Sequence, residues 1–300
     1  MRTSFKVTVL GSSAAVAAHG RSQSALMLSY GNRNYLIDCG EGTQVLLEKY
    51  KISIEKLDVI FISHLHADHF LGVFGLISSM GLRRRKKPLR IIAPIGMKEI
   101  ISVQLKYSST FLPFNLIVEE VGKGVVFQND SLLVKAFPLD HRITTYGYKF
   151  LEKEKDRKLD MTKVPPYFSI DQLKMLKSGK NVSHDQQLFY SEDLTFPPLP
   201  LRSFAYASDT RFFPELIEDV YQVDLLYHES TFTHDMIDRA IKTHHSTAKQ
   251  AGMVARKAEV SKLVIGHFSA RYKDLNPLLE EAKSEFLDTL LAFEGLQIEI

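Results

Sequence analysis

Short apolar runs alternate along the chain with stretches in which apolar residues recur at helical spacing. The short runs are rich in β-branched and aromatic side chains and therefore predict buried strands. The expected strands include residues 5–10, 56–64, 89–94, 203–210, 223–231 and 262–267. The expected helices include residues 42–50, 68–82, 96–107, 246–258 and 277–286. Strands that alternate with helices in this way are typical of sheets covered by helices.

Turn residues between apolar runs predict two hairpins. The first hairpin turns at Gly31 and Asn32, and the second turns at Asn129 and Asp130. Together with the alternation of strands and helices, the hairpins predict two mixed sheets that face each other, with helices outside. The expected fold class is therefore α/β, in the form of a four-layer αββα sandwich.

The pattern changes between residues 151 and 200, where charged residues interrupt the apolar alternation and the sequence FPPLP closes the segment. This composition is typical of an insertion or a projecting arm. We expect one domain over residues 1–300, with an inserted arm at residues 151–200. Between residues 151 and 180 the arm carries eight basic and five acidic residues. The excess alone leaves open whether this surface is merely solvated or binds a partner.

Composition limits the class of protein. An apolar content of 45% supports a sizeable core, and a net charge of +3 does not by itself indicate nucleic-acid binding. Cys39 is the single cysteine, so an internal disulfide and a thiolate zinc site are both excluded. No run approaches the roughly 18 apolar residues of a membrane span, and Lys6 and Gly11 interrupt any secretory signal. We expect a cytoplasmic protein with no membrane partner.

One loop concentrates candidate metal ligands. Directly after an apolar strand, the sequence FISHLHADHFLG places His64, His66, Asp68 and His69 within six positions. Imidazole and carboxylate ligands suit Zn²⁺, and also Mn²⁺ or Fe²⁺. Because Asp68 and His69 cannot easily bind the same ion as His64 and His66, the spacing indicates two metal ions.

Three further candidates, His141, Asp209 and His267, each follow an apolar strand. Any one of them alone would more often be an ordinary turn residue. One binuclear site explains all of them together, with Asp209 as the bridge, because a carboxylate can offer one oxygen to each ion. Such a site activates water for hydrolysis. A metal-storage or structural zinc site is the alternative, and it would require closed coordination.

These residues, in this order and with Asp38 ahead of them, resemble the metallo-β-lactamase superfamily. The motifs LGSSAAV, DCGEGTQ, PLDH, ASDT, HEST, HHSTA and GHFSARY more narrowly resemble the short form of the RNase Z family of tRNA 3′-processing endoribonucleases. The resemblance extends from Val9 to Tyr272. It departs at residues 17–22, where only Arg21 matches, and in the arm, where VPPYFS replaces a Gly-Pro motif. It therefore carries no prediction for how a CCA end is treated.

The resemblance implies a role for each candidate residue. One zinc ion would be held by His64, His66 and His141, the other by Asp68, His69 and His267, and Asp209 would bridge the two. Asp68 would also act as the general base. His245 would act as the general acid that protonates the leaving 3′ oxygen. Glu229 would orient His245, although a buried carboxylate that pairs with a helix N-terminus is the alternative.

The activity that the resemblance implies is a zinc-dependent endoribonuclease that removes 3′ trailers from precursor tRNA. The products would be a 3′-hydroxyl on the tRNA and a 5′-phosphomonoester on the trailer. The resemblance further implies two Zn²⁺ per subunit, with Mn²⁺ as a possible substitute, and a homodimer whose arm grips the tRNA. The basic run 83–87, and Ser269 with Arg271, are expected either to contact phosphates or to serve only local structure.

Two other functions remain open at this point. A small-molecule phosphodiesterase could use the same metal centre, and it would not need the arm. A tRNA-binding module with a degenerate metal site is the non-enzymatic alternative.

Overall fold

The computed structural model describes residues 2–300, which divide into two compact units. The first unit comprises the residues up to Phe127, together with Val134–Phe150 and Ser203–Ile300. The second unit comprises Gln128–Leu133 and Leu151–Arg202.

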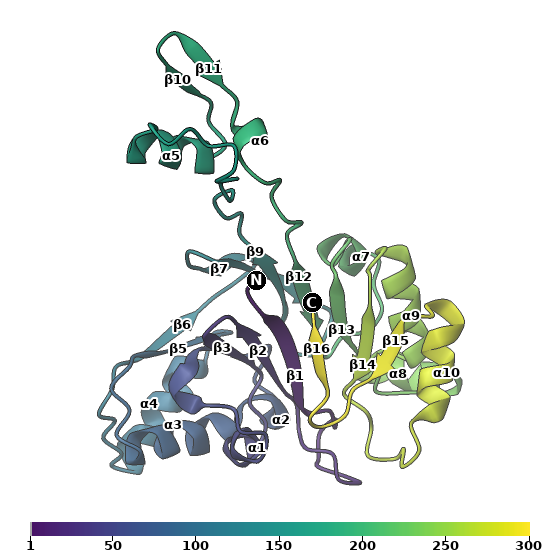
Figure 1. Cartoon of the computed structure of the whole chain (residues 1–300). Helices are drawn as coiled ribbons and strands as arrows, with labels where there is room; N and C mark the ends of the chain where they lie inside the picture. The colour runs from purple at the N-terminus through teal and green to yellow at the C-terminus, as the bar shows by residue number, and fades with distance from the viewer. Residues whose placement is uncertain (1) are drawn as a thin grey trace. The chain divides into compact units, whose positions relative to one another are not determined.

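The first unit contains two seven-stranded sheets with helices on their outer faces (Figure 1). In sheet order, the strands of the first sheet are β16 (Gln297–Glu299), β1 (Phe5–Gly11), β2 (Ala25–Tyr30), β3 (Arg33–Ile37), β4 (Leu57–Phe61), β5 (Leu89–Ala93) and β6 (Leu116–Glu120). Pairing is antiparallel from β16 to β3 and parallel from β3 to β6. The sheet is therefore mixed, as the sequence predicts.

The second sheet also has seven strands, and it begins with strands from the C-terminal part of the chain and ends with the β7–β8 hairpin. Its strands are β15 (Thr289–Leu291), β14 (Leu263–Gly266), β13 (Leu225–Glu229), β12 (Ser203–Ala207), β9 (Thr145–Glu152), β8 (Leu132–Leu139) and β7 (Gly124–Gln128). The strands from β12 to β15 run parallel to one another, so their carboxyl ends lie at one edge of the sheet. Loops that leave this edge can carry side chains to a common site.

Helices of the first unit cover the outer faces of both sheets (Figure 1). They are α1 (Thr43–Lys49), α2 (Ala67–Phe70), α3 (Gly72–Leu82), α4 (Met97–Tyr107), α7 (Glu215–Asp219), α8 (Ile237–Thr243), α9 (Ala248–Lys257) and α10 (Asn276–Glu285), with 3₁₀ turns η1 (Ile54–Lys56) and η2 (His234–Met236). One core packs β-strand residues such as Ile60 and Ile91 against α3 residues such as Leu76 and Ile77. The predicted four-layer αββα sandwich is confirmed.

The helix expected at residues 68–82 is interrupted after Phe70, and the sequence did not predict this break. The amide of Gly72 donates to the carbonyl of Cys39 at 2.9 Å, and the amide of Cys39 donates to the carbonyl of His69 at 2.7 Å. A Cβ atom on Gly72 would lie 1.9 Å from the carbonyl oxygen of Gly40, so only glycine permits this approach. The exchange of hydrogen bonds ties α2, which carries Asp68 and His69, to the end of β3.

The second unit has a small apolar core of its own. Its elements are α5 (Ile170–Lys177), β10 (Val182–His184), β11 (Gln187–Phe189) and α6 (Ser191–Leu194). Phe168, Leu176, Val182 and Leu194 are buried together. The expected arm at residues 151–200 falls within this unit, which also takes in the tip of the β7–β8 hairpin. The hairpin tip is held in the unit by Lys153, whose amide donates to the carbonyl of Ser131 and whose Nζ donates to the carbonyl of Asn129.

None of the helices over residues 2–300 is both long enough and apolar enough to cross a membrane.

Candidate metal centre

All seven predicted ligands come together in the first unit, on the loops that leave strand ends of both sheets. His64 and His66 follow β4, and Asp68 and His69 lie in α2. His141, Asp209 and His267 follow β8, β12 and β14, respectively. Their donor atoms form two groups, each within 4.8 Å, made of His64, His66, His141 and Asp209, and of Asp68, His69 and His267.

In the first group three imidazole nitrogens face one another. His66 Nδ1 lies 3.0 Å from His64 Nε2 and 3.3 Å from His141 Nε2. Asp209 Oδ2 lies 3.6 Å from His64 Nε2 and 3.8 Å from His141 Nε2. Four ligands placed tetrahedrally at ordinary zinc distances are roughly 3.3 Å apart, so this spacing fits one such ion.

The second group receives the other oxygen of the same aspartate. Asp209 Oδ1 lies 3.1 Å from His267 Nε2 and 3.4 Å from His69 Nε2. These two nitrogens are 3.3 Å apart, and Asp68 Oδ2 lies 3.3 Å from the His69 nitrogen and 3.6 Å from the His267 nitrogen. One carboxylate therefore presents a separate oxygen to each group, which is the geometry of a bridge.

The ring nitrogens that point away from the centre are fixed by hydrogen bonds. His69 Nδ1 donates to Asp38 Oδ2 at 2.7 Å, and His141 Nδ1 donates to the carbonyl of His244 at 2.8 Å. His64 Nδ1 contacts Ser63 Oγ at 3.0 Å, and His267 Nδ1 contacts Thr231 Oγ1 at 3.0 Å. When Nδ1 carries the proton, Nε2 has a free lone pair, so these four rings are held ready to bind a cation at the centre.

Burial and charge set the protonation states of the groups. Burial lowers the pKa values of His64, His66 and His141, so these rings are neutral near pH 7. Burial acts to raise the pKa of Asp209, but His267 and His69 outweigh it and the pKa falls below its usual range. The pKa of Asp68 is lowered in the same way by His69 and His267. Burial would lower the pKa of His69, but the carboxylates of Asp209, Asp38 and Asp68 raise it, so a cation bound there would displace a proton from this ring. The neutral imidazoles of the first group and the anionic carboxylates form a donor set for divalent cations.

His245 and Glu229 form a hydrogen-bonded pair beside the two groups. His245 Nδ1 lies 2.8 Å from Glu229 Oε1, and the pKa of His245, which burial would lower, is raised to about 9 by the Glu229 carboxylate. Glu229 also accepts hydrogen bonds from the amides of Thr210 and Thr231 at 3.0 Å each. Glu229 therefore pairs with His245 and loop amides, and the alternative of a helix N-terminus is wrong.

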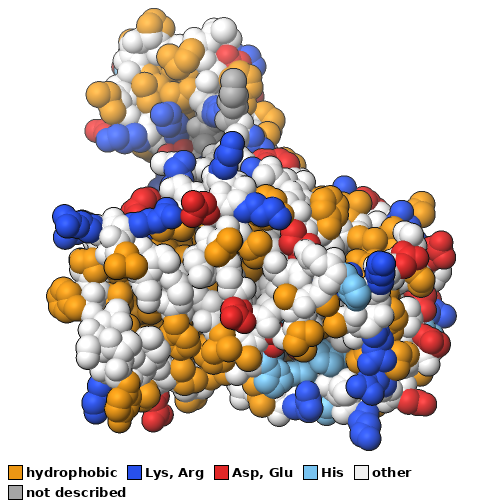
Figure 2. All heavy atoms as spheres, turned by 90° about the horizontal axis from the view of Figure 1, so that it is seen from below, with side chains coloured by type: hydrophobic (Ala, Val, Ile, Leu, Met, Phe, Trp, Pro, Cys, Tyr) orange, Lys and Arg blue, Asp and Glu red, His pale blue; other side chains and the backbone are white. Residues whose placement is uncertain are grey.

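The centre opens into a cavity of 480 Å³ whose lining includes Asp68, Asp209, His245 and His267. Three arginines also line it, namely Arg142, Arg239 and Arg271. Figure 2 shows a group of histidine side chains on one face, with Lys and Arg side chains beside it. The cavity therefore combines metal-ligand chemistry with cationic side chains that suit a phosphate-containing substrate.

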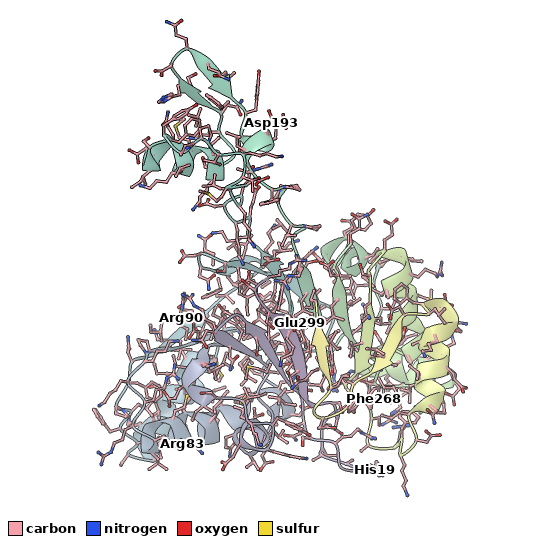
Figure 3. The ribbon with its side chains drawn as sticks, viewed as in Figure 1. His19, Arg83, Arg90, Asp193, Phe268 and Glu299 are labelled. Atoms are coloured by element: carbon pink, nitrogen blue, oxygen red, sulfur yellow. The ribbon has the colours of Figure 1, made fainter. Side chains whose placement is uncertain are left out.

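Two loops at the rim of the cavity are tied to each other. The loop after β1 and the loop after β14 exchange hydrogen bonds through Ala14, Ser12 and Phe268, and His19 Nε2 lies 2.8 Å from the carbonyl of Ala270. Figure 3 labels His19 and Phe268 in these loops. Asp68 Oδ2 accepts a hydrogen bond from the amide of Ala15 at 2.8 Å, so the first loop also positions Asp68.

Comparison with known proteins identifies the family. A protein from Cytophaga hutchinsonii named Ribonuclease Z is 45% identical over 296 residues, which cover 97% of this chain and 95% of the relative. The chain belongs to the ribonuclease Z family. The family that the sequence motifs resemble is thereby confirmed.

Solved structures agree with this membership of the ribonuclease Z family. Human tRNase Z, short form, has a TM-score of 0.72 at 26% identity, over 98% of both chains. The metallo-β-lactamase fold protein YhfI from Bacillus subtilis has a TM-score of 0.71 at 19% identity, over 99% of this chain and 100% of that chain. This second likeness confirms the metallo-β-lactamase fold. A family model described as Anti-Pycsar protein Apyc1 matches residues 5–142, a span that ends before Asp209 and His267.

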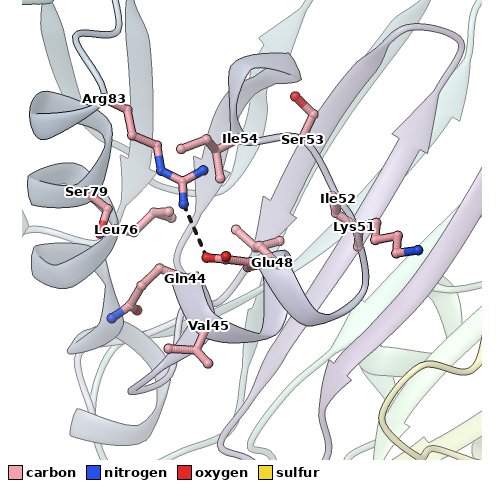
Figure 4. A pocket seen from close by; sticks show the side chains of 11 residues that line it. Gln44, Val45, Glu48, Lys51, Ile52, Ser53, Ile54, Leu76, Ser79 and Arg83 are labelled. Atoms are coloured by element: carbon pink, nitrogen blue, oxygen red, sulfur yellow. Dashed lines mark hydrogen bonds and ion pairs between the residues drawn. The ribbon is translucent and has the colours of Figure 1, made fainter.

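In the basic run 83–87, Arg83 and Arg85 make contacts within the protein, whereas Arg84 and Lys86 are exposed. Arg85 is buried, and its guanidinium donates to the carbonyls of Ile54, Leu57, Lys87 and Pro88. Arg83 pairs with Glu48 at 3.2 Å across a separate hollow between α1 and α3, of 300 Å³ (Figure 4). Of the two roles expected for this run, Arg85 has the local structural one, because its side chain satisfies buried backbone oxygens, and phosphate contact by the exposed residues stays a prediction.

Sequence reasoning gave no role to two residues that the ribonuclease Z fold places against the ligands. Asp38 is buried and accepts hydrogen bonds from His69, from Ser63 and from the hydroxyl of Tyr206. Its signal was present, because Asp38 ends an apolar strand as the other candidates do. His244 contacts His141 through its backbone carbonyl, and no residue type signals a backbone contact.

Proposed function

We propose that this ribonuclease Z family member is a zinc-dependent endoribonuclease that cuts precursor tRNA and leaves a 3′-hydroxyl on the tRNA. The single observation that carries the proposal is the carboxylate of Asp209, whose two oxygens face two separate groups of ligands beside the His245–Glu229 pair. Relatives named Ribonuclease Z and the likeness to human tRNase Z support RNA as the substrate.

The residues present fit two divalent ions. One would be held by His64, His66 and His141, the other by Asp68, His69 and His267, with Asp209 shared between them. When bound, the ions would supply an activated water and neutralise negative charge on the phosphodiester. Ligation by imidazole nitrogens and carboxylate oxygens favours Zn²⁺, and Mn²⁺ is the proposed substitute.

His245 is the proposed general acid. As water adds to phosphorus, the bond from phosphorus to the 3′ oxygen breaks, and that oxygen needs a proton. His245 lines the cavity, and its raised pKa of about 9 keeps it protonated at neutral pH. Glu229 holds the ring through Nδ1, which leaves Nε2 to carry the proton to the leaving oxygen.

Asp68 is the proposed general base. Its Oδ2 accepts a hydrogen bond from Ala15 and lies close to His69 and His267, so the carboxylate cannot rotate freely. Burial would raise the pKa of Asp68, but His69 and His267 lower it below its usual range, so the carboxylate is ionised at neutral pH and can accept a hydrogen bond that orients the attacking water.

The second unit is the proposed tRNA-binding arm. Lys174, Lys177 and Lys180 are exposed on it, as are the aromatic rings of Tyr167 and Phe196. Exposed cations bind backbone phosphates, and exposed rings stack on bases. This combination supports RNA over a small ester. A homodimer and a cytoplasmic location also remain part of the proposal, the latter because Cys39 is a free, buried thiol.

The deciding experiment incubates the zinc-loaded protein with a 3′-extended precursor tRNA and maps both new ends. The proposal expects one cut 3′ to the discriminator base, with a 3′-hydroxyl and a 5′-phosphate. A small-molecule phosphodiesterase would instead turn over bis(p-nitrophenyl) phosphate rapidly and leave the tRNA intact. A tRNA-binding module would bind the tRNA and cleave neither substrate.

A further inference from the structure

A three-residue cluster beside the metal centre has no part in the chemistry described so far. His244 Nδ1 lies 2.9 Å from Asp140 Oδ1, and Arg211 Nε donates to Asp140 Oδ2 at 2.7 Å. The three residues belong to three different loops, which follow β8, β12 and α8. Each is the sequence neighbour, or the second neighbour, of a residue that the proposed reaction uses.

The backbone strengthens the same connection. The amide of Arg211 donates to the carbonyl of Asp140 at 3.0 Å, and the amide of Asp140 donates to Thr210 Oγ1 at 3.1 Å. The loop that carries Asp209 is therefore fastened to the loop that carries His141 independently of any metal ion.

His244 has a left-handed backbone conformation in which its carbonyl faces His141. It ends α8 in the left-handed region, with φ 56° and ψ 51°. In this conformation its carbonyl accepts the hydrogen bond from His141 Nδ1 at 2.8 Å. The chain then continues into His245, whose ring centre lies 5.1 Å from that of His141. A non-glycine residue in this region costs free energy, so the surrounding contacts must hold it there.

We propose that Asp140 and Arg211 clamp the His244 side chain so that its carbonyl orients the metal ligand His141 and its backbone places the proton donor His245. His244 is thus a positioning residue that fixes the spacing between the first group of ligands and the general acid. The inference rests on the proposed metal-dependent cleavage. It adds that the clamped His244 fixes the position of the ligand His141 relative to the proton donor His245.

Two substitutions at His244 separate the clamp from the backbone conformation. Glycine adopts the left-handed region readily but has no side chain, so His244→Gly removes only the clamp. Asparagine tolerates the same region, and its Nδ2 occupies the position of the histidine Nδ1, so His244→Asn keeps a donor to Asp140.

Glu259 provides a matched control. It also lies just beyond a helix end, with φ 52°, and its carboxylate accepts hydrogen bonds from Tyr221 and Gln222 at the surface. Glu259→Gly therefore removes a side-chain contact at a left-handed position that is not attached to any ligand.

The first measurement is the zinc affinity of each apo-protein, by competition with a coloured chelator. Loss of the group that orients a ligand typically costs about 10–100-fold in affinity or activity. We expect a loss of this size in His244→Gly, near-complete recovery in His244→Asn, and no change in Glu259→Gly. Equal affinities for His244→Gly and Glu259→Gly, or an equal loss in both His244 variants, would overturn the inference.

The second measurement separates kcat from KM for precursor tRNA at saturating zinc. A misplaced proton donor should lower kcat of His244→Gly by roughly 10-fold or more with KM unchanged. Unchanged kcat at full zinc occupancy would remove the part of the inference that concerns His245. If the wild-type protein does not cleave tRNA, the proposed function fails, and the order of zinc affinities still tests the clamp.

Discussion

Glu229 accepts a hydrogen bond from His245 Nδ1 at 2.8 Å, and the same carboxylate accepts one from Thr231 Oγ1 at 2.7 Å. Thr231 Oγ1 in turn lies 3.0 Å from His267 Nδ1. Because the hydroxyl proton of Thr231 goes to Glu229, the hydroxyl oxygen can accept the proton of His267. The buried Glu229 thus connects the proposed general acid to a proposed metal ligand.

Glu229→Gln should move the alkaline limb of the pH–rate profile to lower pH. A general acid works only while protonated, so activity falls as pH rises through the pKa of His245, about 9 in the presence of Glu229. Without the carboxylate, burial dominates and lowers that pKa. The measurement is kcat against pH for both proteins, with Glu259→Gln as a surface control. An alkaline limb that stays in place would contradict the assignment.

His245→Ala should slow cleavage by roughly 10²–10⁴-fold, the usual contribution of a positioned proton donor. Metal content should remain that of the wild-type protein, because Nδ1 of His245 is bonded to Glu229 and the seven proposed ligands are intact. Single-turnover cleavage and elemental analysis check both statements, with His184→Ala in the second unit as the control. Loss of metal would mean that His245 is a ligand, as its proximity to Asp209 and His267 would allow.

Asp38→Asn should weaken metal binding by about 10–100-fold although Asp38 is not a proposed ligand. The carboxylate accepts the Nδ1 proton of His69 at 2.7 Å, and an amide can present its nitrogen there instead. Chelator competition measures the effect. Asp58→Asn is the control, since Asp58 pairs with Arg33 and Lys87 elsewhere on the first unit. Equal affinities for the two variants would show that Asp38 only supports the fold.

The residues of this site differ in how far the sequence could predict them. The convergence of His141, Asp209 and His267 was predictable because each follows a strand with a plain apolar run, and strand ends of one sheet edge converge, while their role as metal ligands stays a prediction. Asp38 also follows an apolar strand, but it orients the ligand His69 and is not itself a proposed ligand, so a search for metal ligands gave it no role. The carbonyl of His244 carried none, because every residue has a backbone carbonyl and the direction of this one depends on the left-handed turn after α8.

The elements show a similar division. Strand and helix positions followed from local periodicity, whereas the break before Gly72 depends on a contact with Gly40 some thirty residues away in the chain. Arg85 likewise looked like a surface cation, and only the fold reveals the four carbonyls that surround it. Local sequence patterns therefore predict the helices and strands, whereas the helix break before Gly72 and the burial of Arg85 depend on contacts between residues far apart in the chain.

Replacing Lys174, Lys177 and Lys180 together by Glu should raise KM for precursor tRNA and flatten its dependence on salt. Each lost phosphate contact reduces the slope of log K against log salt by about one. Turnover of bis(p-nitrophenyl) phosphate should not change, because the metal-ligand residues lie in the first unit. The same change at Lys49, Lys51 and Lys56 is the control. An unchanged KM would contradict the proposed role of the second unit.

Asp209 is proposed to bridge two divalent ions. A crystal structure of the zinc-loaded protein, with anomalous difference maps on both sides of the zinc edge, measures this directly. Two zinc peaks about 3.5–4 Å apart are expected, one on each side of the Asp209 carboxylate. A single peak, or two peaks of which one is bound by His245 and not by Asp209, would contradict it.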